Sequence, residues 1–295
     1  MPTGYTTTGA LADSLPVVIS AARIVREFVG VMPNLVEKQT LGEGIGLSWN
    51  EISLAQLTAT AVTESTRLDN PQQIADTLFT ITPTVFGIHT VVTDRVATRI
   101  SKTAFAKIGT LAMNGIQRKK DEDGLTLLDG ATTSLAGAGV TLTSGHIAAA
   151  VARVKSNTTE PGMGPVRCVL HGFQIKDTFD EITGGIGTYP VPEGMSAQVW
   201  ANMFHGKVSS AEVFEDGNIT IDGSDDAKGG VFIQSGIVLV QGRNLRTYPR
   251  FEPDIGGGAT SIWIYDEYAF GERLAGGSTS SFVIELYSDA LQPTS

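Results

Sequence analysis

Apolar and polar residues alternate along the stretch DTLFTITPTVFGIHTVV, residues 76–92. Its apolar positions share one face of an extended chain: Phe79, Ile81, Pro83 and Val85. A period of two residues predicts a strand with one covered face. The earlier segment GIGLSWNEISLAQLTA predicts an outgoing strand, and the polar segment from Glu64 to Gln73, which contains a proline, predicts the tip between the two. The pattern therefore predicts a two-stranded arm over residues 41–92.

A helical period replaces the alternation after residue 92. Thr93 or Asp94 suits an N-cap. Small or apolar residues then recur three or four positions apart: Val96, Ile100, Ala104, Ile108, Leu111 and Gly115. This spacing predicts one helix over residues 93–120, roughly 40 Å long at the usual rise per residue. We expect Gly124 to end it.

Short helical and strand patterns follow in the second half of the chain. Helical spacing marks three segments, around Ile147–Val154 after an N-cap at Thr143 or Ser144, around Ile175–Ile182, and around Trp200–Phe204. Strand patterns include the one at Cys168, a hairpin over residues 207–221 with an Asp-Gly turn, an apolar strand pair or bent strand over 229–243, and strands in SIWIYDEYAF and SSFVIELYS. One long helix, several short ones and mostly antiparallel strands predict an α+β fold.

Composition excludes several classes of protein. The net charge is −10 without a block of like charges, and no basic stripe of the kind that grips DNA phosphates is present. The single cysteine, Cys168, excludes an intrachain disulfide and sits in an apolar strand pattern that favours a buried, inert thiol. The N-terminus has no basic region before its apolar part, and no span reaches about 20 apolar residues, so we expect a cytoplasm-like compartment and no membrane.

No motif predicts a catalytic, metal-binding or cofactor-binding site. The four histidines stand far apart, and the glycine-rich segments LGEGIGL and AGAGVTL lack the third glycine of a dinucleotide fingerprint. The acidic run EDGNITIDGSDD lacks the twelve-residue spacing of a calcium loop and is typical of turns. We therefore expect no enzyme activity, no metal and no cofactor.

The predicted arm is too long for the body that carries it. Two legs of about 14 residues reach roughly 45 Å, whereas a compact chain of this size has a radius of about 25 Å. A lone ribbon would leave Phe79, Ile81 and Val85 in water, at about 1.5–3 kcal/mol each. We therefore expect another copy of the protein to cover this face, with the tip charges Glu64, Arg67 and Asp69 setting the register. The alternative is a hairpin packed along its own domain.

The order of these parts resembles the HK97-type major capsid proteins of tailed bacteriophages. A loose N-terminal segment, a long β-hairpin, a long helix, an α+β block and C-terminal strands follow one another in the same order over nearly the whole chain. The closest local likeness is the run from Leu57 to Arg95, where a threonine-alternating strand leads through Val-Thr-Asp directly into the helix. The resemblance lies in the order of the elements and in the local pattern of residues. No single motif in it is unique to the family.

The resemblance implies a domain division. Residues 1–34 would form an N-terminal arm and residues 44–90 the extended hairpin, called the E-loop in that family. The P-domain would comprise residues 35–43, 91–142 and 259–295, with its spine helix at 93–120. Residues 143–258 would form the A-domain, whose glycine-rich loop at 184–194 is the candidate for its tip.

The resemblance also implies a mechanical function. Copies of the chain would assemble as pentamers and hexamers into an icosahedral shell around double-stranded DNA, in a virion capsid assembled in the host cytoplasm. Portal, scaffolding and decoration proteins would be further partners, and DNA would be enclosed without sequence-specific binding. Some members of the family join neighbours through a lysine of the E-loop. This chain has no lysine between Lys38 and Lys102, so we expect a shell without such cross-links.

Two other functions fit the sequence less well. The first is an encapsulin-like compartment shell, which would have the same fold and load an enzyme rather than a genome. The second is a β-rich hydrolase whose site is assembled from scattered residues. Large particles in electron micrographs would exclude the hydrolase, and neighbouring genes would separate the two kinds of shell.

Overall fold

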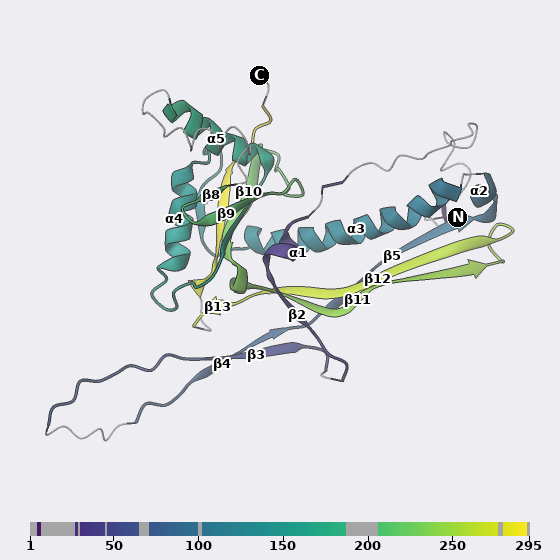
Figure 1. The fold of residues 1–295 in the computed structure, drawn as a ribbon. Coiled ribbons are helices and arrows are strands. Elements are labelled where there is room, and N and C mark those ends of the chain that lie inside the picture. Colours follow the sequence, from purple (N-terminus) through teal and green to yellow (C-terminus); the bar gives the residue numbers. More distant parts are fainter. Residues whose placement is uncertain are drawn as a thin grey trace.

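The computed structural model describes residues 5–6, 27–28, 30–44, 46–64, 71–99, 102–186, 206–276 and 280–293. The chain divides into three parts: a long sheet with a helix along it, a block of strands and helices at one end, and a hairpin that projects away from both (Figure 1). The predicted α+β class is confirmed.

A five-stranded sheet forms the long part of the molecule. Its strands lie in the order β1 (Tyr5–Thr6), β5 (Thr84–Thr93), β12 (Ala259–Glu272), β11 (Ile237–Glu252) and β2 (Glu37–Thr40). The three central strands are antiparallel, and the short outer strands are parallel to their neighbours. The helices α2 (Asp94–Arg99) and α3 (Lys102–Asp129) follow β5, and Ala112 and Ile116 of α3 pack on Ile264 of β12. One face of the sheet is therefore covered by α3.

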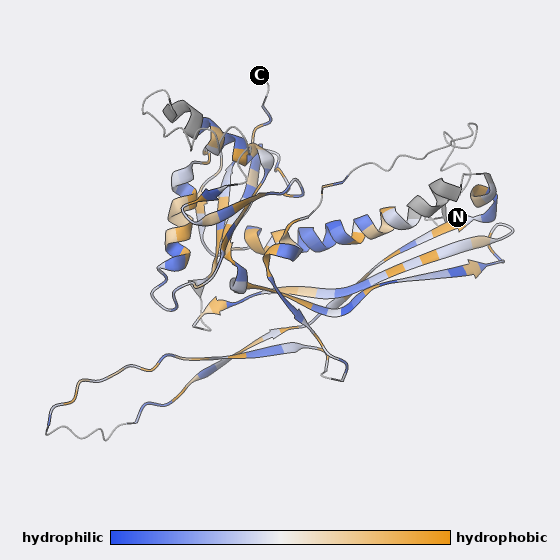
Figure 2. Ribbon diagram, in the orientation of Figure 1, coloured by the Kyte–Doolittle hydropathy of each residue, from blue (hydrophilic) through white to orange (hydrophobic). Residues whose placement is uncertain are grey.

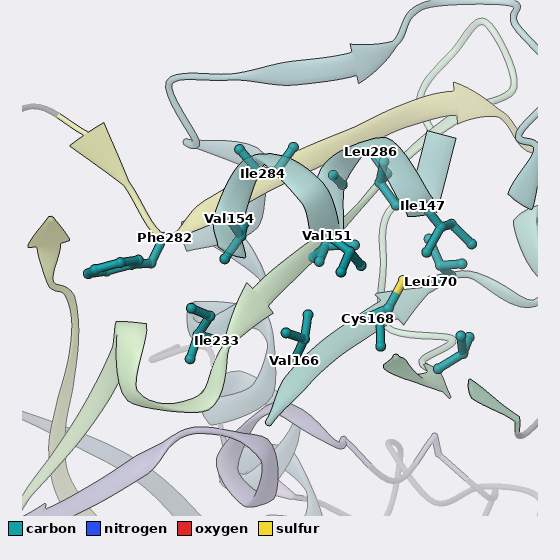
Figure 3. Packing of buried hydrophobic residues seen from close by; sticks show 14 of the residues in the cluster. Ile147, Val151, Val154, Val166, Cys168, Leu170, Ile233, Phe282, Ile284 and Leu286 are labelled. Atoms are coloured by element: carbon teal, nitrogen blue, oxygen red, sulfur yellow. The ribbon is translucent and has the colours of Figure 1, made fainter. Parts of the chain in front are cut away.

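A six-stranded sheet forms the block at the other end. Its strands lie in the order β6 (Ser134–Ala136), β15 (Val283–Asp289), β10 (Asp226–Ile233), β7 (Val166–Leu170), β9 (Ala211–Glu215) and β8 (Lys207–Val208). The helices α4 (Ser144–Lys155) and α5 (Gly172–Ile186) flank it. Figure 3 shows Cys168 among the aliphatic side chains between α4 and the strands, where the thiol is fully buried and free, as predicted.

The predicted helix after residue 143 is confirmed in detail. The hydroxyl of Thr143 accepts a hydrogen bond from the backbone N–H of His146 at 3.3 Å, and the imidazole Nδ1 of His146 accepts one from the N–H of Thr143 at 3.2 Å. This reciprocal pair is a capping box that uses histidine in place of glutamate. Ile147, Val151 and Val154 are buried, because the helical spacing puts them on one face.

The prediction that Gly124 ends the long helix is wrong. Helix α3 continues to Asp129. Gly124 lies instead where α1 (Met32–Leu35) and β12 meet the helix, and a Cβ there would lie 2.9 Å from the Met32 Cβ and 3.3 Å from the Phe270 ring. A glycine within a helical pattern can serve close packing as well as termination.

The predicted returning strand of the arm is two strands. The hairpin proper consists of β3 (Trp49–Leu54) and β4 (Asp76–Ile81), and β5 begins separately at Thr84. Pro83 lies between them and has no N–H for a ladder. Residues 84–90, which the domain division assigns to the E-loop, pair with β12 in the long sheet.

Other boundaries also differ from the sequence prediction. The tight turn of the hairpin after residue 207 is at Ser209 and Ser210, both with positive φ, and not at Asp216-Gly217. The segment 229–243 is a bent strand: β10 lies in the six-stranded sheet and, after the 3-10 turn η1 (Gln234–Gly236), β11 lies in the five-stranded sheet. The predicted domain division assigns β11 (Ile237–Glu252) to the A-domain, but β11 pairs with β12 of the P-domain. It assigns β15 to the P-domain, but β15 pairs with β10 of the A-domain. The domain division itself stays a prediction.

Some predictions fall outside the described residues. These are the loop 184–194 beyond residue 186, and the short helix at Trp200 and Phe204. The small strand pair β13 (Leu274–Ala275) and β14 (Ser280–Ser281) lies near the C-terminus. Among the described helices, none is long and apolar enough to span a membrane.

Candidate assembly surfaces

The hairpin β3–β4 is a sheet of its own. Trp49 pairs with Ile81, Glu51 with Phe79 and Ile52 with Leu78, and neither strand pairs with a strand of the larger sheets. Opposite residues share a face, so the register gives the ribbon two distinct faces. The inner face carries Trp49, Glu51, Phe79 and Ile81, and the outer face carries Asn50, Ile52, Leu54, Asp76, Leu78 and Thr80.

The inner face is covered by the chain itself at the root of the hairpin. Ile81 is buried against Val238 and Val240 of β11, with Trp49 and Phe79 packed around them. The Trp49 and Phe79 rings meet edge to face at 6.2 Å. Gly271 of β12 makes room for this, because a Cβ there would lie 2.5 Å from the Ile81 Cδ1. The chain itself therefore buries Ile81 and partly covers Phe79, because alternation shows that a face is covered but not by what. That another copy contacts this face stays a prediction.

Arg273 fastens the root of the hairpin. Its guanidinium donates to both Glu37 carboxylate oxygens on β2 and, at 2.7 Å, to the Glu51 carboxylate on β3. A further N–H bonds the Ser235 carbonyl at 2.7 Å, and the guanidinium lies 5.8 Å from the centre of the Trp49 ring. The hydrogen bond from Arg273 holds the pKa of Glu37 below its ordinary value. This bidentate arrangement sets the direction in which the hairpin leaves the body.

Replacing Arg273 by alanine should loosen the hairpin root. Two carboxylates, Glu37 and Glu51, would lose their cation, and charge-assisted bonds are worth about 1.5–3 kcal/mol. We expect the hydrogen-exchange protection of the β4 amides to fall about 10- to 100-fold. The matched control is Arg243→Ala, because Arg243 is exposed and pairs only with Glu267 at 3.2 Å among the described contacts. Equal protection in both variants would contradict this role.

The apolar residues on the outer face of the hairpin are uncovered. Ile52 is 61% exposed and Leu78, directly opposite, is 62% exposed. Further exposed aliphatic residues continue the surface along both legs: Leu54, Leu57, Val62 and Ile74. Figure 2 shows apolar residues recurring along the projecting hairpin. We call this surface, centred on Ile52, Leu54 and Leu78, the leucine face. Such a concentration of exposed apolar side chains marks an interaction surface.

A second exposed surface lies on the five-stranded sheet, on the side away from α3. His89 stacks on Trp263 with ring centres 3.5 Å apart, Trp263 stacks on Tyr265 at 6.3 Å, and Tyr265 lies 6.4 Å from Tyr248. The Tyr265 ring covers Gly87, whose missing Cβ leaves room for it. We call this row of rings the aromatic face.

The aromatic face has a recess and a basic border. A cavity of about 100 Å³ is lined by Val85, Arg246, Tyr248 and Tyr265, among others. Val85 is 57% exposed there. Arg246 and Arg250 are exposed on the same strand as Tyr248, and β11 carries three arginines against one glutamate. This surface can therefore accept both aliphatic side chains and carboxylates.

The residues predicted for subunit contact divide into three groups. Phe79 and Ile81 lie on the covered inner face, whereas Val85 lies on the aromatic face. Glu64 is exposed near the tip, and Arg67 and Asp69 fall outside the described residues. Periodicity alone missed Ile52, Leu54 and Leu78. The sequence feature that could have revealed them is the presence of apolar residues on both legs of the arm at the positions that alternate with Phe79, and therefore on the opposite face.

Three of the four histidines and the acidic run have structural partners among the described residues. His89 stacks on Trp263, His146 caps α4, and the Nδ1 of His171 accepts from the N–H of Phe173 at 3.2 Å. In the acidic run, the Asp222 carboxylate accepts from the N–H groups of Ser224 and Asp226, which is turn chemistry. The described residues contain no group of three or more histidine, cysteine, aspartate or glutamate side chains that could hold a metal ion.

Comparison with solved structures identifies the fold. The head structure of Helicobacter pylori bacteriophage KHP40 has a chain that aligns with a TM-score of 0.71 over 99% of this chain and 100% of its own, at 11% identity. A chain of the cyanophage Pam1 capsid aligns with a TM-score of 0.71 over 94% and 96%, at 10% identity. The chain has the fold of phage capsid proteins.

A third comparison shows how far sequence has diverged within this fold. A Mycobacterium phage Che8 structure aligns over 91% of this chain and 95% of its own, with a TM-score of 0.68 and 17% identity. No family model and no curated protein matches the sequence. The expected resemblance to the HK97-type capsid fold is thus confirmed in three dimensions.

Proposed function

We propose that the chain is the major capsid subunit of a tailed bacteriophage, which assembles as pentamers and hexamers into an icosahedral shell. The observation that carries this proposal is the leucine face of the hairpin. The chain shares its fold with phage capsid chains over almost its whole length. Its hairpin nevertheless points away from the body and leaves Ile52 and Leu78 exposed to water. A two-stranded ribbon gains stability when another surface covers it.

The aromatic face of a second copy is the proposed cover for the leucine face. Within one molecule the hairpin and the far end of the long sheet point in different directions (Figure 1). Their charges are complementary: residues 44–82 carry four carboxylates and one arginine, and β11 carries three arginines and one glutamate. Complementary charge favours correct docking and suppresses wrong register. Val85 and the tip residues Glu64, Arg67 and Asp69 would then belong to this contact.

The shell would enclose double-stranded DNA without sequence-specific binding. A net charge of −10 suits a wall that repels its contents weakly rather than gripping them. The site of action would be the virion capsid, with assembly in the host cytoplasm and with portal, scaffolding and decoration proteins as further partners. No catalytic residue or cofactor is needed for this function.

Neighbouring subunits would be held without E-loop lysine cross-links. The hairpin has no lysine to supply, because none occurs between Lys38 and Lys102. Boiling purified particles in SDS should therefore release single chains of 31.1 kDa. A ladder of higher bands that survives boiling and reduction would contradict the absence of covalent links.

Electron microscopy of the purified full chain tests the function. We expect closed shells tens of nanometres across, because many copies must meet to cover every hairpin. Chains that need a scaffolding protein should form such shells when it is co-expressed. A monomer in both conditions, with the hairpin still exposed, would overturn the proposal.

A further inference from the structure

Two carboxyl groups lie buried together where three distant segments meet. Asp121 is in the middle of α3, and Asp216 directly follows β9. Asp121 is 0% exposed and Asp216 is 1% exposed. Asn218 bonds both carboxyls, and the consecutive residues Val31 and Met32 bond one each, which brings the two carboxyls together. Nothing in the capsid function derived above uses this pair.

Both carboxyls hold the segment that leads out of the N-terminal region. Asp121 accepts from the backbone N–H of Met32 at 2.9 Å, and Asp216 accepts from that of Val31 at 3.2 Å. Asn218 joins the pair, since its side chain donates to Asp121 and its backbone N–H donates to Asp216, both at 2.9 Å. The pair therefore ties residues 31–32 to the long helix and to the turn after β9.

The residues that precede Val31 also pack against this site. Gly30 lies against the Asp121 carboxyl so tightly that a Cβ would overlap it. The Phe28 ring lies over Gly217, where a Cβ would lie 2.5 Å from the ring. Glu27 pairs with Arg118 of α3 at 3.4 Å. Opening the pair would thus release residues 27–28 and 30–32, which we call the N-terminal root.

The pair can be accommodated best with one proton between its carboxyls. Two buried like charges in contact are costly, whereas a single proton lets one carboxyl donate to the other. Burial, together with the charge of Asp216, raises the pKa of Asp121 from 3.8 to about 7. The ionisable groups around the pair do not neutralise it: Arg118 pairs with Glu27, Glu215 adds negative charge, and burial lowers the pKa of His171.

We propose that Asp121 and Asp216 form a proton-dependent latch, which fastens the N-terminal root to α3 when the carboxyls share a proton and loosens it when that proton is lost. The proposal does not depend on the capsid function, because it concerns the folded subunit alone. The sign follows from linkage: the closed latch binds a proton that the open one releases. Closure is therefore favoured at acidic pH and weakens as the pH rises from about 4 to about 7.

Hydrogen exchange of the full chain between pH 5 and 8.5 tests the latch. After correction for intrinsic exchange, protection of the Val31 and Met32 amides should fall by up to about tenfold per pH unit between pH 5 and 7, and should level off above pH 7. Asp121→Asn, which can still donate to Asp216 but cannot ionise, should remove this slope. Asp254→Asn is the matched control, because Asp254 is exposed, and it should keep the wild-type slope.

Asp216→Asn provides a second variant: it removes the neighbouring charge but leaves Asp121 buried and ionisable, so the slope should end at a lower pH than in the wild type. If Asp121→Asn does not give folded protein, this shift is measured in Asp216→Asn. A wild-type protection that changes by less than twofold between pH 5 and 7 would overturn the latch. So would the full slope in folded Asp121→Asn, because another group would then be responsible, or an Asp216→Asn variant whose slope ends at the same pH as in the wild type.

Discussion

Replacing Ile52 and Leu78 together by glutamate should abolish shell assembly without unfolding the subunit. Both side chains are mostly exposed in the single chain, so their replacement removes little packing there. In the proposed contact they become buried, where each contributes about 1.5–3 kcal/mol and a carboxylate is strongly disfavoured. The association constant of each contact should therefore fall at least 10²- to 10⁴-fold. Sedimentation velocity should find free subunits, with a thermal midpoint close to that of the wild type.

Met163→Glu is the matched control for this double substitution. Met163 is another highly exposed apolar residue, in the loop before β7 and outside the leucine face. It should leave both stability and assembly unchanged, because the proposal gives it no contact. Normal shells from the Ile52→Glu, Leu78→Glu variant would show that the leucine face is not a subunit contact.

Replacing Lys120 by methionine should destabilise the subunit itself. The ammonium of Lys120 lies 3.1 Å from the Asp266 carboxylate, which is 2% exposed, and bonds the amide oxygen of Gln241. It also lies 4.7 Å from the centre of the Tyr268 ring, and burial lowers its pKa. Without this cation the buried Asp266 carboxylate has no counter-ion, which lowers the free energy of unfolding by about 3–5 kcal/mol. We expect the thermal midpoint to fall by about 10 °C.

Two further variants separate this effect from a loss of surface charge. Lys119→Met breaks an exposed pair with Asp123, four residues on, and should cost less than about 1 kcal/mol. Adding Asp266→Asn to Lys120→Met should restore most of the lost stability, because the unpaired charge is then absent. If Lys119→Met and Lys120→Met had equal effects on the thermal midpoint, the buried pair would not join α3 to β12 as described.

Periodicity predicted the local elements well. Apolar residues at helical spacing located α4, where Ile147, Val151 and Val154 are buried, and alternation placed Cys168 on a covered face. Order along the chain was enough to indicate the capsid fold, since the sequence of hairpin, long helix and α+β block is retained where identity has fallen to 11%. These features depend on local spacing, which a sequence displays directly.

Tertiary pairing was not visible in the same way. Alternation marked Phe79 and Ile81 as covered, but nothing local indicates that their cover is β11 of the same chain. A glycine near the end of a helical pattern is typical of a helix stop, and the pattern predicts such a stop at Gly124. The actual role of Gly124 is close packing against Met32, which lies about 90 residues away in sequence and is therefore invisible to a local pattern. Likewise, a bent connection at Gln234–Gly236 carries one apolar run from one sheet into the other, which a period of two cannot reveal.

Photo-cross-linking from the leucine face tests the central claim most directly. A photoreactive residue at position 78 would be placed in shells assembled from equal amounts of isotopically light and heavy chains. We expect mixed light–heavy cross-linked peptides that end in residues 243–267, on the aromatic face of another copy. Shells in which position 78 cross-links only within its own chain, or to any other segment of its neighbours, would contradict the account.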